Sequence, residues 1–567
     1  MIKQNVSSVI AASLAALVGA AALLLLLRGP APARADSPHY VASDCTGVSS
    51  PCHTTIQDAV NAASPGDEIR VATGTYTGVQ TLGGGVQLVY ISKTVTIRGG
   101  YIAPGFADPP DPDNNPTVLD AEGQGRVIYV ASSISPTIEG LWITGGNASN
   151  ALVSNGRGGG IYSNGAIPII VNNVITGNIA YTSTSSWGYG GGIYVSSPPG
   201  VAVITGNQVL SNVASTSYHA YGGGIYLGGA SSAQAVNNVV LSNTASITGG
   251  RGYGGGIALS GGNGVTVTGN RVEGNVAQGG PAASFGSGGG GIYCHSSDDA
   301  TLGDNIVRYN TASVPANGRG GGIGIDRCQR LTVVGNTLQG NVGSAGTTTG
   351  GGRGGGLGAY AARDLVINGN RVLSNTAGFY TGWGGGLYLS RNTTFTMTNN
   401  IVAANSANYQ GGGMAFETGG ASEPVTGTLA HNTFAANDRG SGNGRIAIHL
   451  NDPYVTLVLT NNLIYSHTYG LYATTGSTAT LYNTLFYANS SGDTGGPGII
   501  VNTDPITGQD PLLDAGYHLQ AGSPAINAGV DAGVSTDIDG DPRVGPPDVG
   551  ADEFIATVYL PLVLRNH

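Results

Sequence analysis

The stretch Tyr189-Gly-Gly-Gly-Ile-Tyr194 and the later stretch Asn207-Gln-Val-Leu-Ser-Asn212 indicate a repeat fold, because both motifs recur along the chain. The asparagine motif has the pattern Asn-x-(apolar)-x-x-Asn. It begins 12 to 14 residues after the apolar residue that follows each of the first eight Gly triplets. A repeat of this size corresponds to one supersecondary unit of a solenoid. The apolar residue after the Gly triplet occurs nine times, 27 to 35 residues apart, at Ile161, Ile193, Ile225, Ile257, Ile292, Ile323, Leu357, Leu387 and Met414.

The residues between the two motifs alternate between apolar and polar, as in Gly264-Val-Thr-Val-Thr-Gly-Asn270. This period of two is typical of strands, and no helical pattern intervenes. Short strands at a fixed repeat predict coils stacked about 4.8 Å apart, each buried against the next. The sequence therefore predicts an all-β, single-stranded right-handed parallel β-helix. We expect the recurring asparagines to adopt left-handed backbone geometry and to hydrogen-bond their counterparts as an internal ladder.

The composition narrows the function classes. The 567 residues include 98 Gly, only 10% charged residues and a formal net charge of −10. The only lysines are Lys3 and Lys93, so we expect no extended surface for neutralising a phosphate backbone and no nucleic-acid partner. The return from each asparagine motif to the next triplet varies from 14 to 22 residues. Length variation therefore lies on one edge of the rod, which in repeat proteins is often the binding face.

The amino-terminal end predicts export. Residues 1–35 contain Lys3, an apolar run from Val9 to Leu27, and small residues at Ala33 and Ala35. This pattern is typical of a secretory signal peptide cleaved before Asp36. An uncleaved membrane anchor is the alternative, because the apolar run is nearly long enough to span a bilayer.

The remaining chain divides into a repeat region and two ends. Ile56, Ala59, Val60 and Ala63 have helical spacing and predict a short amphipathic helix that caps the first coil. Residues 557–567 form a short tail, which is either a sorting tail or a frayed end. The predicted segments are an amino-terminal cap and first coil at 36–80, the β-helix repeats at 81–500, carboxyl-terminal coils with a cap at 501–556, and the tail at 557–567.

Several stretches resemble known families. The capping helix, with Val95-Thr-Ile-Arg-Gly-Gly-Tyr101 and Thr117-Val-Leu-Asp-Ala121, resembles pectin-lyase-like β-helix proteins. The Gly-Gly-Gly-Ile and Phe434-Ala-Ala-Asn437 motifs are similar to the repeats of polymorphic outer-membrane proteins, which implies an adhesive surface β-helix. The carboxyl end resembles the choice-of-anchor Q domain family, which implies export and cell-surface association but no known reaction. Its matching stretches are Gly522–Gly529, Asp537–Arg543 and Asp548–Glu553.

Two columns of flat side chains flank the triplets and are the predicted ligand-binding residues. Sugar rings dock on aromatic faces, with arginine supplying polar contacts. The alternative is that these side chains only stabilise neighbouring coils. Four residues before the apolar position stand Arg157, Tyr189, Tyr221, Tyr253, Arg319, Arg353 and Trp383, and directly after it stand Tyr162, Tyr194, Tyr226, Tyr293 and Tyr388.

One pair of side chains is a candidate for catalysis. His295 and Asp326 share the same offset on successive coils, so we expect a hydrogen-bonded His and carboxylate pair, with Tyr360 at the same offset on the next coil. No Gly-His-Gly or Arg-Ile-Lys motif of the polygalacturonase-like enzymes is present. A polar patch exposed to solvent is the alternative, because no motif completes a mechanism.

The cysteines and a cluster of aspartates complete the candidates. Cys45 and Cys52 flank a short loop and predict a disulfide in an oxidising compartment. Cys294 and Cys328 have different offsets along their strands, about 10 Å apart, and we expect no bond between them. Asp537, Asp539 and Asp541 are possible Ca²⁺ ligands, but they lack the spacing of the twelve-residue calcium loop, so roles in turns and in pairing with Arg543 are the alternative. We expect no other cofactor.

The sequence favours an exported β-helix protein, secreted or on a bacterial-type cell surface, that binds polysaccharide or cell-surface glycan, or acts as an adhesin, through its loop-bearing face. The alternatives are a polysaccharide lyase or glycoside hydrolase of the pectin-lyase-like class, and a structural protein of the cell envelope.

Overall fold

The computed structural model describes residues 38–229, 232–248, 250–278, 287–437 and 442–555. The predicted signal peptide and the predicted tail at 557–567 lie outside these residues. Within the described part of the chain, no helix has the length and apolar character needed to cross a membrane.

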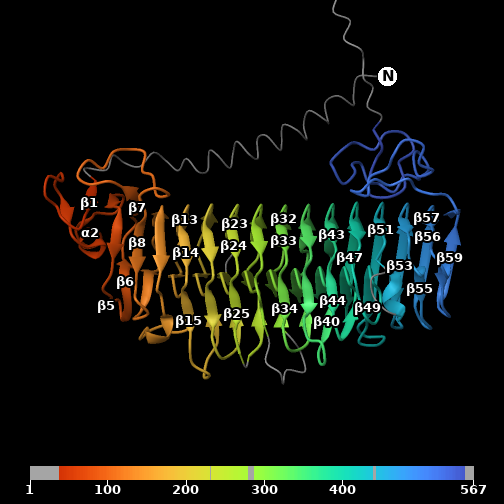
Figure 1. The fold of residues 1–567 in the computed structure, drawn as a ribbon, viewed down its shortest axis with the longest axis horizontal. Helices are drawn as coiled ribbons and strands as arrows, with labels where there is room; N and C mark the ends of the chain where they lie inside the picture. The colour runs from red at the N-terminus through yellow and green to blue at the C-terminus, as the bar shows by residue number, and fades with distance from the viewer. Residues whose placement is uncertain (1–37, 230–231, 249, 279–286, 438–441, 556–567) are drawn as a thin grey trace, which may run out of the picture.

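The described chain forms a long rod of stacked coils, a parallel β-helix as predicted (Figure 1). Each coil contributes one strand to each of three long parallel sheets. In one coil these are β27 (Ile257–Ser260), β28 (Thr266–Thr268) and β29 (Arg271–Glu273). We call their sheets, of 15, 17 and 15 strands, the triplet sheet, the middle sheet and the asparagine sheet. A smaller seven-stranded sheet, the loop sheet, is formed by strands that precede the triplets, such as β26 (Gly252–Tyr253).

The Gly triplet is required by the approach of neighbouring coils. Gly254 has a left-handed φ of 63°, a conformation that a side chain disfavours. A Cβ on Gly255 would lie 2.4 Å from the carbonyl oxygen of Gly290 in the next coil. The next residue, Ile257, is fully buried and pairs with Ile225 on one side and Ile292 on the other. The triplet therefore turns the chain tightly enough to bury one apolar residue per coil in a continuous core.

Two internal asparagine ladders run along the rod, one at each end of the asparagine sheet's strands. Asn270 accepts a hydrogen bond from the backbone N–H of Asn238, and its amide donates to Ala235 O at 2.8 Å and to Asn305 Oδ1 at 2.9 Å. The ladder prediction is confirmed, but the left-handed residue is the one before each asparagine, such as Gly269 at φ 66°. The ladders comprise Asn173, Asn207, Asn238, Asn270, Asn305, Asn336, Asn370, Asn400, Asn432 and Asn462, and Asn178, Asn212, Asn243, Asn275, Asn310, Asn341, Asn375, Asn405, Asn437 and His467.

The two ends of the rod are covered differently. The predicted capping helix is α2 (Ile56–Ala62), which buries Ile56, Ala59 and Val60 against the first coils. The rod continues to β59 (Ile499–Thr503) and β60 (Ile506–Thr507). The chain after β60 then folds back along the last coils rather than extending the rod (Figure 1).

This carboxyl-terminal cap, residues 508–555, is held by side chains from five successive coils. Asn461 exchanges two hydrogen bonds with Val530, and Arg543 is nearly fully buried against Glu553 at 3.1 Å. The cap therefore joins the last coils to one another in addition to their sheets. The five residues that contact it are Arg371, at the start of β43 (Arg371–Leu373), and the turn residues Asn399, His431, Asn461 and Asn483.

Candidate functional site

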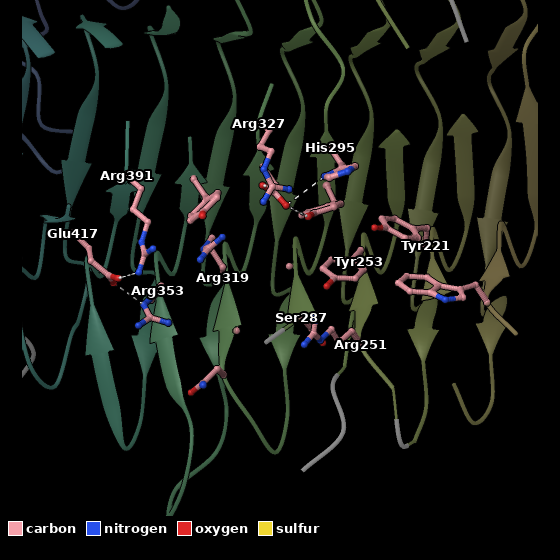
Figure 2. Close-up of a pocket in the computed structure, with 17 residues that line it drawn as sticks. Tyr221, Arg251, Tyr253, Ser287, His295, Arg319, Arg327, Arg353, Arg391 and Glu417 are labelled. Atoms are coloured by element: carbon pink, nitrogen blue, oxygen red, sulfur yellow. Dashed lines mark hydrogen bonds and ion pairs between the residues drawn. The ribbon is translucent and has the colours of Figure 1, made fainter. Parts of the chain in front are cut away.

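A groove of about 500 Å³ runs along the rod where the triplet sheet meets the loop sheet (Figure 2). Its lining begins at Trp187 and ends at Glu417, and the triplets between these residues belong to eight successive coils. The triplet-sheet strands that line it are β31 (Ile292–His295), β36 (Ile323–Asp326), β41 (Leu357–Tyr360) and β49 (Met414–Glu417). Its loop-sheet strands are β21 (Ala220–Tyr221), β26, β30 (Ser287–Gly288), β35 (Gly318–Arg319) and β40 (Gly351–Arg353).

The tyrosines that follow the triplets point away from the core, but the loop strands cover them. Tyr162, Tyr194 and Tyr226 pack under Tyr189 and Tyr221 in a separate aromatic cluster. The expectation that this column of flat side chains contacts ligands is therefore wrong for these three tyrosines, because the inserted loops fold onto them. Exposure is between 1% and 8% at Tyr162, Tyr194, Tyr226, Tyr293 and Tyr388, of which only Tyr293 lines the groove.

The aromatic rings at one end of the groove stack on one another. The Tyr221 and Tyr253 rings lie 4.8 Å apart at an interplanar angle of 22°, and Trp187 stacks on Tyr221 at 5.5 Å. Burial raises the pKa of Tyr221 and Tyr253, so both phenols stay protonated. Because neighbouring rings occupy each other's faces, these residues offer mainly edges and hydroxyl groups to a ligand. The stacks also stabilise neighbouring coils, as the alternative interpretation of the columns predicts.

Arginines line the rest of the groove and outnumber its carboxylates. Glu417 is shared between Arg353 at 3.3 Å and Arg391 at 3.5 Å. Burial alone would raise the pKa of Glu417, but the Tyr388 hydroxyl and the two guanidinium groups outweigh it and lower the pKa. The groove therefore carries net positive charge in a protein whose formal charge is −10. Its five arginines are Arg251, Arg319, Arg327, Arg353 and Arg391, and its two acidic residues are Asp326 and Glu417.

The predicted His and carboxylate pair lies in this groove. His295 Nδ1 is 3.3 Å from Asp326 Oδ2, and the hydroxyl of Tyr293 donates to the same oxygen at 3.2 Å. Burial alone would raise the pKa of Asp326, but the contact with His295 and the charge of Arg327 lower it. Tyr360 follows on the next coil, as its offset predicts, and also lines the groove. The register inferred from the triplets is therefore confirmed for all three residues.

The comparisons with known proteins support the fold. A family model described as a right handed beta helix region matches residues 200–354. The fold is a right-handed parallel β-helix. No curated protein matches the chain.

Several solved structures are similar to this chain in fold. The catalytic unit of the GH87 α-1,3-glucanase from Streptomyces thermodiastaticus is 14% identical, with 84% of this chain and 71% of that chain covered and a TM-score of 0.34. Pectate lyase Pel9A is 12% identical, with coverages of 92% and 97% and a TM-score of 0.27. The A-module of mannuronan C-5 epimerase AlgE6 from Azotobacter vinelandii is 12% identical, with coverages of 80% and 93% and a TM-score of 0.29.

The remaining predicted ligand-binding residues lie beside the groove. Arg157 packs over the Tyr189 ring at 5.8 Å, and Trp383 packs against the guanidinium of Arg353 at 5.2 Å. Neither Arg157, Tyr189 nor Trp383 belongs to the groove lining. Tyr189 and Trp383 belong to the loop sheet, and the contacts of all three residues join neighbouring coils along the rod.

The structure adds groove residues that the sequence analysis did not select. Glu417 stands three residues after Met414, the same offset as His295, Asp326 and Tyr360, so the register contained a signal for it. Arg391 directly follows its triplet-sheet strand and has no such signal from alternation. Trp187 and Arg251 share an offset of six residues before the apolar position, which the loop sheet keeps in register, but the residue types at this offset show no pattern.

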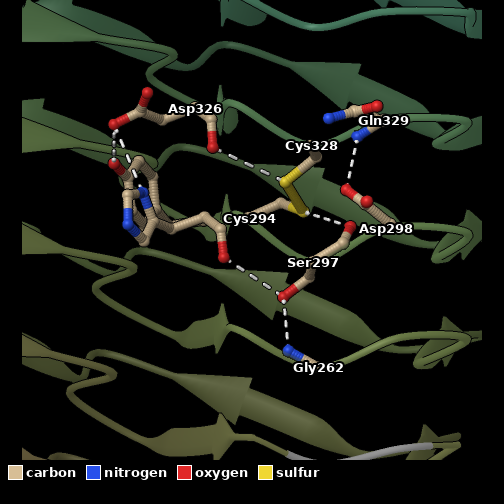
Figure 3. Close-up of a disulfide and its surroundings, with 9 residues drawn as sticks. Gly262, Cys294, Ser297, Asp298, Asp326, Cys328 and Gln329 are labelled. Atoms are coloured by element: carbon tan, nitrogen blue, oxygen red, sulfur yellow. Dashed lines mark hydrogen bonds and ion pairs between the residues drawn. A yellow bond between two sulfur atoms is a disulfide. The ribbon is translucent and has the colours of Figure 1, made fainter.

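The bond between Cys294 and Cys328 corrects an expectation (Figure 3). The expected separation assumed that β36 continues straight past Asp326. Instead the chain turns at Arg327, whose φ is 56°, and this brings the Cα atoms of the two cysteines to 6.6 Å. Both cysteines are fully buried between adjacent coils. The bond therefore fixes β31 and β36 to each other beside His295 and Asp326. The predicted Cys45–Cys52 bond is confirmed.

Replacing Cys294 and Cys328 together by serine is expected to lower the free energy of unfolding by about 3–4 kcal/mol, because the bond closes a long loop. The Cys45→Ser/Cys52→Ser variant is the matched control, and its shorter loop predicts a loss nearer about 2 kcal/mol. Denaturant unfolding of the three proteins measures the difference. Equal losses for both variants would contradict the loop-length argument.

The aspartates considered for calcium do not converge on one point. Asp537 accepts hydrogen bonds from the backbone N–H groups of Asp539 and Asp541, the turn role given as the alternative, while Arg543 pairs with Glu553. Asp539 instead joins His518 and Asp552, whose ligand atoms lie within 4.8 Å of one another.

The guanidinium of Arg371 supplies the positive charge next to this cluster. It lies 3.0 Å from Asp539 and 3.1 Å from the Nε2 atom of His518. These residues do not fit a calcium ion, because an imidazole and a guanidinium replace the oxygen ligands that calcium requires.

Proposed function

We propose that this chain is an exported surface β-helix protein that binds acidic polysaccharide lengthwise along the groove. The observation that carries the proposal is the set of five arginines in one groove that spans eight coils. Seven coil steps of about 4.8 Å give a groove roughly 34 Å long, which suits a polymer better than a small molecule. Guanidinium groups bind carboxylate and ester anions in fixed geometry, so they supply the affinity.

The aromatic end of the groove supports the same proposal in a different way from the sequence expectation. Its phenol hydroxyls and ring edges can contact sugar hydroxyls and C–H groups while the ring faces hold the coils together. Polymer recognition then depends on the arginines for anions and on the phenols for the sugar hydroxyls. Export and cell-surface association are part of the proposal, supported by the signal-like residues 1–35 and by the resemblance of the carboxyl end to choice-of-anchor Q domains.

Affinity electrophoresis in gels that contain polygalacturonate, alginate or a sulfated galactan tests the proposal. We expect at least one acidic polymer to retard the protein, and Arg353→Gln to reduce its affinity about tenfold. Added salt should weaken binding in the same gels, because the contact is electrostatic. Arg363→Gln is the matched control, since Arg363 is exposed and outside the groove. Migration unchanged by every acidic polymer would refute the proposal.

A second candidate, polysaccharide lyase, is favoured by the His295–Asp326 pair. His295 Nδ1 faces Asp326, so Nε2 is the ring nitrogen left to accept a proton from a substrate carbon next to a uronate carboxylate. Nearby guanidinium groups would neutralise that carboxylate. Hydrolysis is less well supported, because Asp326 and Glu417 both have lowered pKa values and neither is held as a proton-donating acid.

Incubation with polyuronates tests the lyase candidate, since elimination leaves a conjugated carbon–carbon double bond that absorbs ultraviolet light. The wild type should release this product, and His295→Ala should abolish release while leaving binding measurable. A wild type that binds polyuronate without releasing product excludes this candidate and leaves the binding proposal standing.

A further inference from the structure

Three guanidinium groups from two coils converge on one ring in the groove, the phenol of Tyr360: Arg319 and Arg327 flank strand β36, and Arg391 follows β46 (Leu387–Ser390). The guanidinium carbons of Arg319, Arg327 and Arg391 lie 4.7, 5.5 and 6.0 Å from its centroid. We call these four residues the Tyr360 cluster. Like charges so close repel one another, and a single aromatic face offsets only part of that repulsion. The arrangement therefore suits an anion that all three groups can share.

The acidic side chains nearby fill this role only in part, since Arg391 pairs with Glu417 at 3.5 Å and with Glu423 at 3.7 Å while Arg319 is left over. Among the described residues, Arg319 has no carboxylate within ion-pair distance, and its buried Nε atom has no hydrogen-bond partner. Asp326 is engaged by His295 and Tyr293 and lies 3.6 Å from Arg327. Glu417 is engaged by Tyr388 and by two arginines. The Tyr360 cluster thus keeps unsatisfied positive charge and at least one unused donor.

Two of the three arginines occupy a backbone position that disfavours side chains. Arg327 and Arg391 follow their strands at φ values of 56° and 46°. The six other coils from Ile161 to Leu387 place small residues at the same turn position, also at left-handed φ: Gly165, Ser197, Gly229, Gly261, Ser296 and Ala361. A left-handed backbone is less favourable for arginine than for glycine. Arg327 and Arg391 are therefore the two long side chains at a turn position that otherwise holds glycine, serine or alanine in these coils.

We propose that the Tyr360 cluster binds a tetrahedral oxyanion ester, sulfate or phosphate, carried by a sugar of the polysaccharide. This inference rests on the proposed function, because the same groove holds the polymer. A planar carboxylate is satisfied by the two parallel N–H groups of one guanidinium. Three guanidinium groups that surround one ring from two coils instead match a group with three terminal oxygens.

Substitution to glycine gives a sharp test, because it removes the charge without straining the fold. Arg327→Gly and Arg391→Gly place glycine at left-handed φ values, so both should fold at least as stably as the wild type. Arg319→Gln removes the arginine without a carboxylate partner. Each change is expected to lower affinity for the esterified polymer by about tenfold to a hundredfold.

Arg330→Gly is the matched control. Arg330 lies on the same coil as Arg327, also has a left-handed φ, 52°, and is half exposed, but it pairs with Asp299 outside the groove. The Arg330→Gly substitution removes one positive charge from the same coil, and it should leave the affinity for the esterified polymer within about twofold of that of the wild type.

The binding assay compares κ-carrageenan with its desulfated backbone, phosphomannan with its dephosphorylated form, and polygalacturonate. Binding to one esterified polymer that is lost on de-esterification and weakened by the three substitutions supports the inference, and the polymer that binds identifies the ester. Equal or tighter binding to polygalacturonate, with the same sensitivity to the three substitutions, overturns the inference and retains the proposed function. Binding to none of the anionic polymers overturns both.

Discussion

Acidification from pH 7 to pH 4 is expected to destabilise the carboxyl-terminal coils by on the order of 3 kcal/mol for each of three buried histidines. Burial lowers the pKa of His431 and His467 to about 3 and that of His449 to about 4. In the unfolded chain the same imidazoles have a pKa of about 6.5. Between these values the unfolded state binds more protons than the folded state. Stability is therefore intact above about pH 6.5 and falls as the pH falls toward the folded pKa values.

His467 provides the most direct variant for this prediction. It stands in the asparagine ladder, where its Nε2 atom accepts the backbone N–H of Asn437 at 3.1 Å. Asparagine occupies the equivalent position in the preceding coils, so His467→Asn can continue the ladder without a titratable group. We expect its melting temperature to depend less steeply on pH between 7 and 4 than that of the wild type.

Thermal unfolding across this pH range measures the effect, with His53→Asn as the control because His53 is only partly buried. A wild-type melting temperature that stays constant from pH 7 to pH 4 would be inconsistent with buried neutral imidazoles. Equal pH slopes for wild type and His467→Asn would exclude His467 as a contributor.

Replacing Asn310 by alanine is expected to cost on the order of 4 kcal/mol, a large effect for a single substitution. Asn310 Oδ1 accepts two hydrogen bonds from Asn275, and its amide donates to Val272 O and to Asn341 Oδ1. Alanine removes all four bonds and leaves buried polar groups of the neighbouring coils without partners. No water can replace them in the fully buried ladder.

Denaturant unfolding followed by circular dichroism measures the loss, and Asn263→Ala is the control. Asn263 is exposed, and its recorded hydrogen bond uses only its backbone carbonyl, so its replacement should change stability by less than about 0.5 kcal/mol. A loss at Asn310 as small as that at Asn263 would show that the ladder contributes little to stability.

The sequence allowed the fold to be predicted because the structural requirements repeat. Gly255 must lack a side chain next to Gly290, Ile257 must be apolar between its counterparts, and Asn270 must bond along the rod. Each requirement recurs once per coil, so it leaves a periodic signal. The short turn at Arg327 leaves a weaker signal, since the same left-handed position holds glycine, serine, alanine or arginine in different coils. That turn explains why the Cys294–Cys328 bond was not predicted.

The site was predictable only where it follows the register of the strands. His295, Asp326 and Tyr360 share one offset from the triplet, and the structure brings them into one groove. The coverage of Tyr194 and Tyr226 depends on how the inserted loops fold, and loops of variable length carry no period. Arg391 and Arg251 also stand at fixed offsets from their triplets, but the residue types at these offsets vary from coil to coil and gave no signal. The charge of the groove therefore emerged only from the three-dimensional structure.

The carboxyl-terminal cap gives the rod uneven resistance to local opening. In a solenoid each coil contacts only its neighbours, so amide hydrogens near an end exchange as coils detach one at a time. The cap contacts five coils, from Arg371 to Asn483, and none of these coils can detach until the cap is released. Their amides should therefore exchange together with one shared protection factor, while protection in the coils before Arg371 changes gradually along the rod.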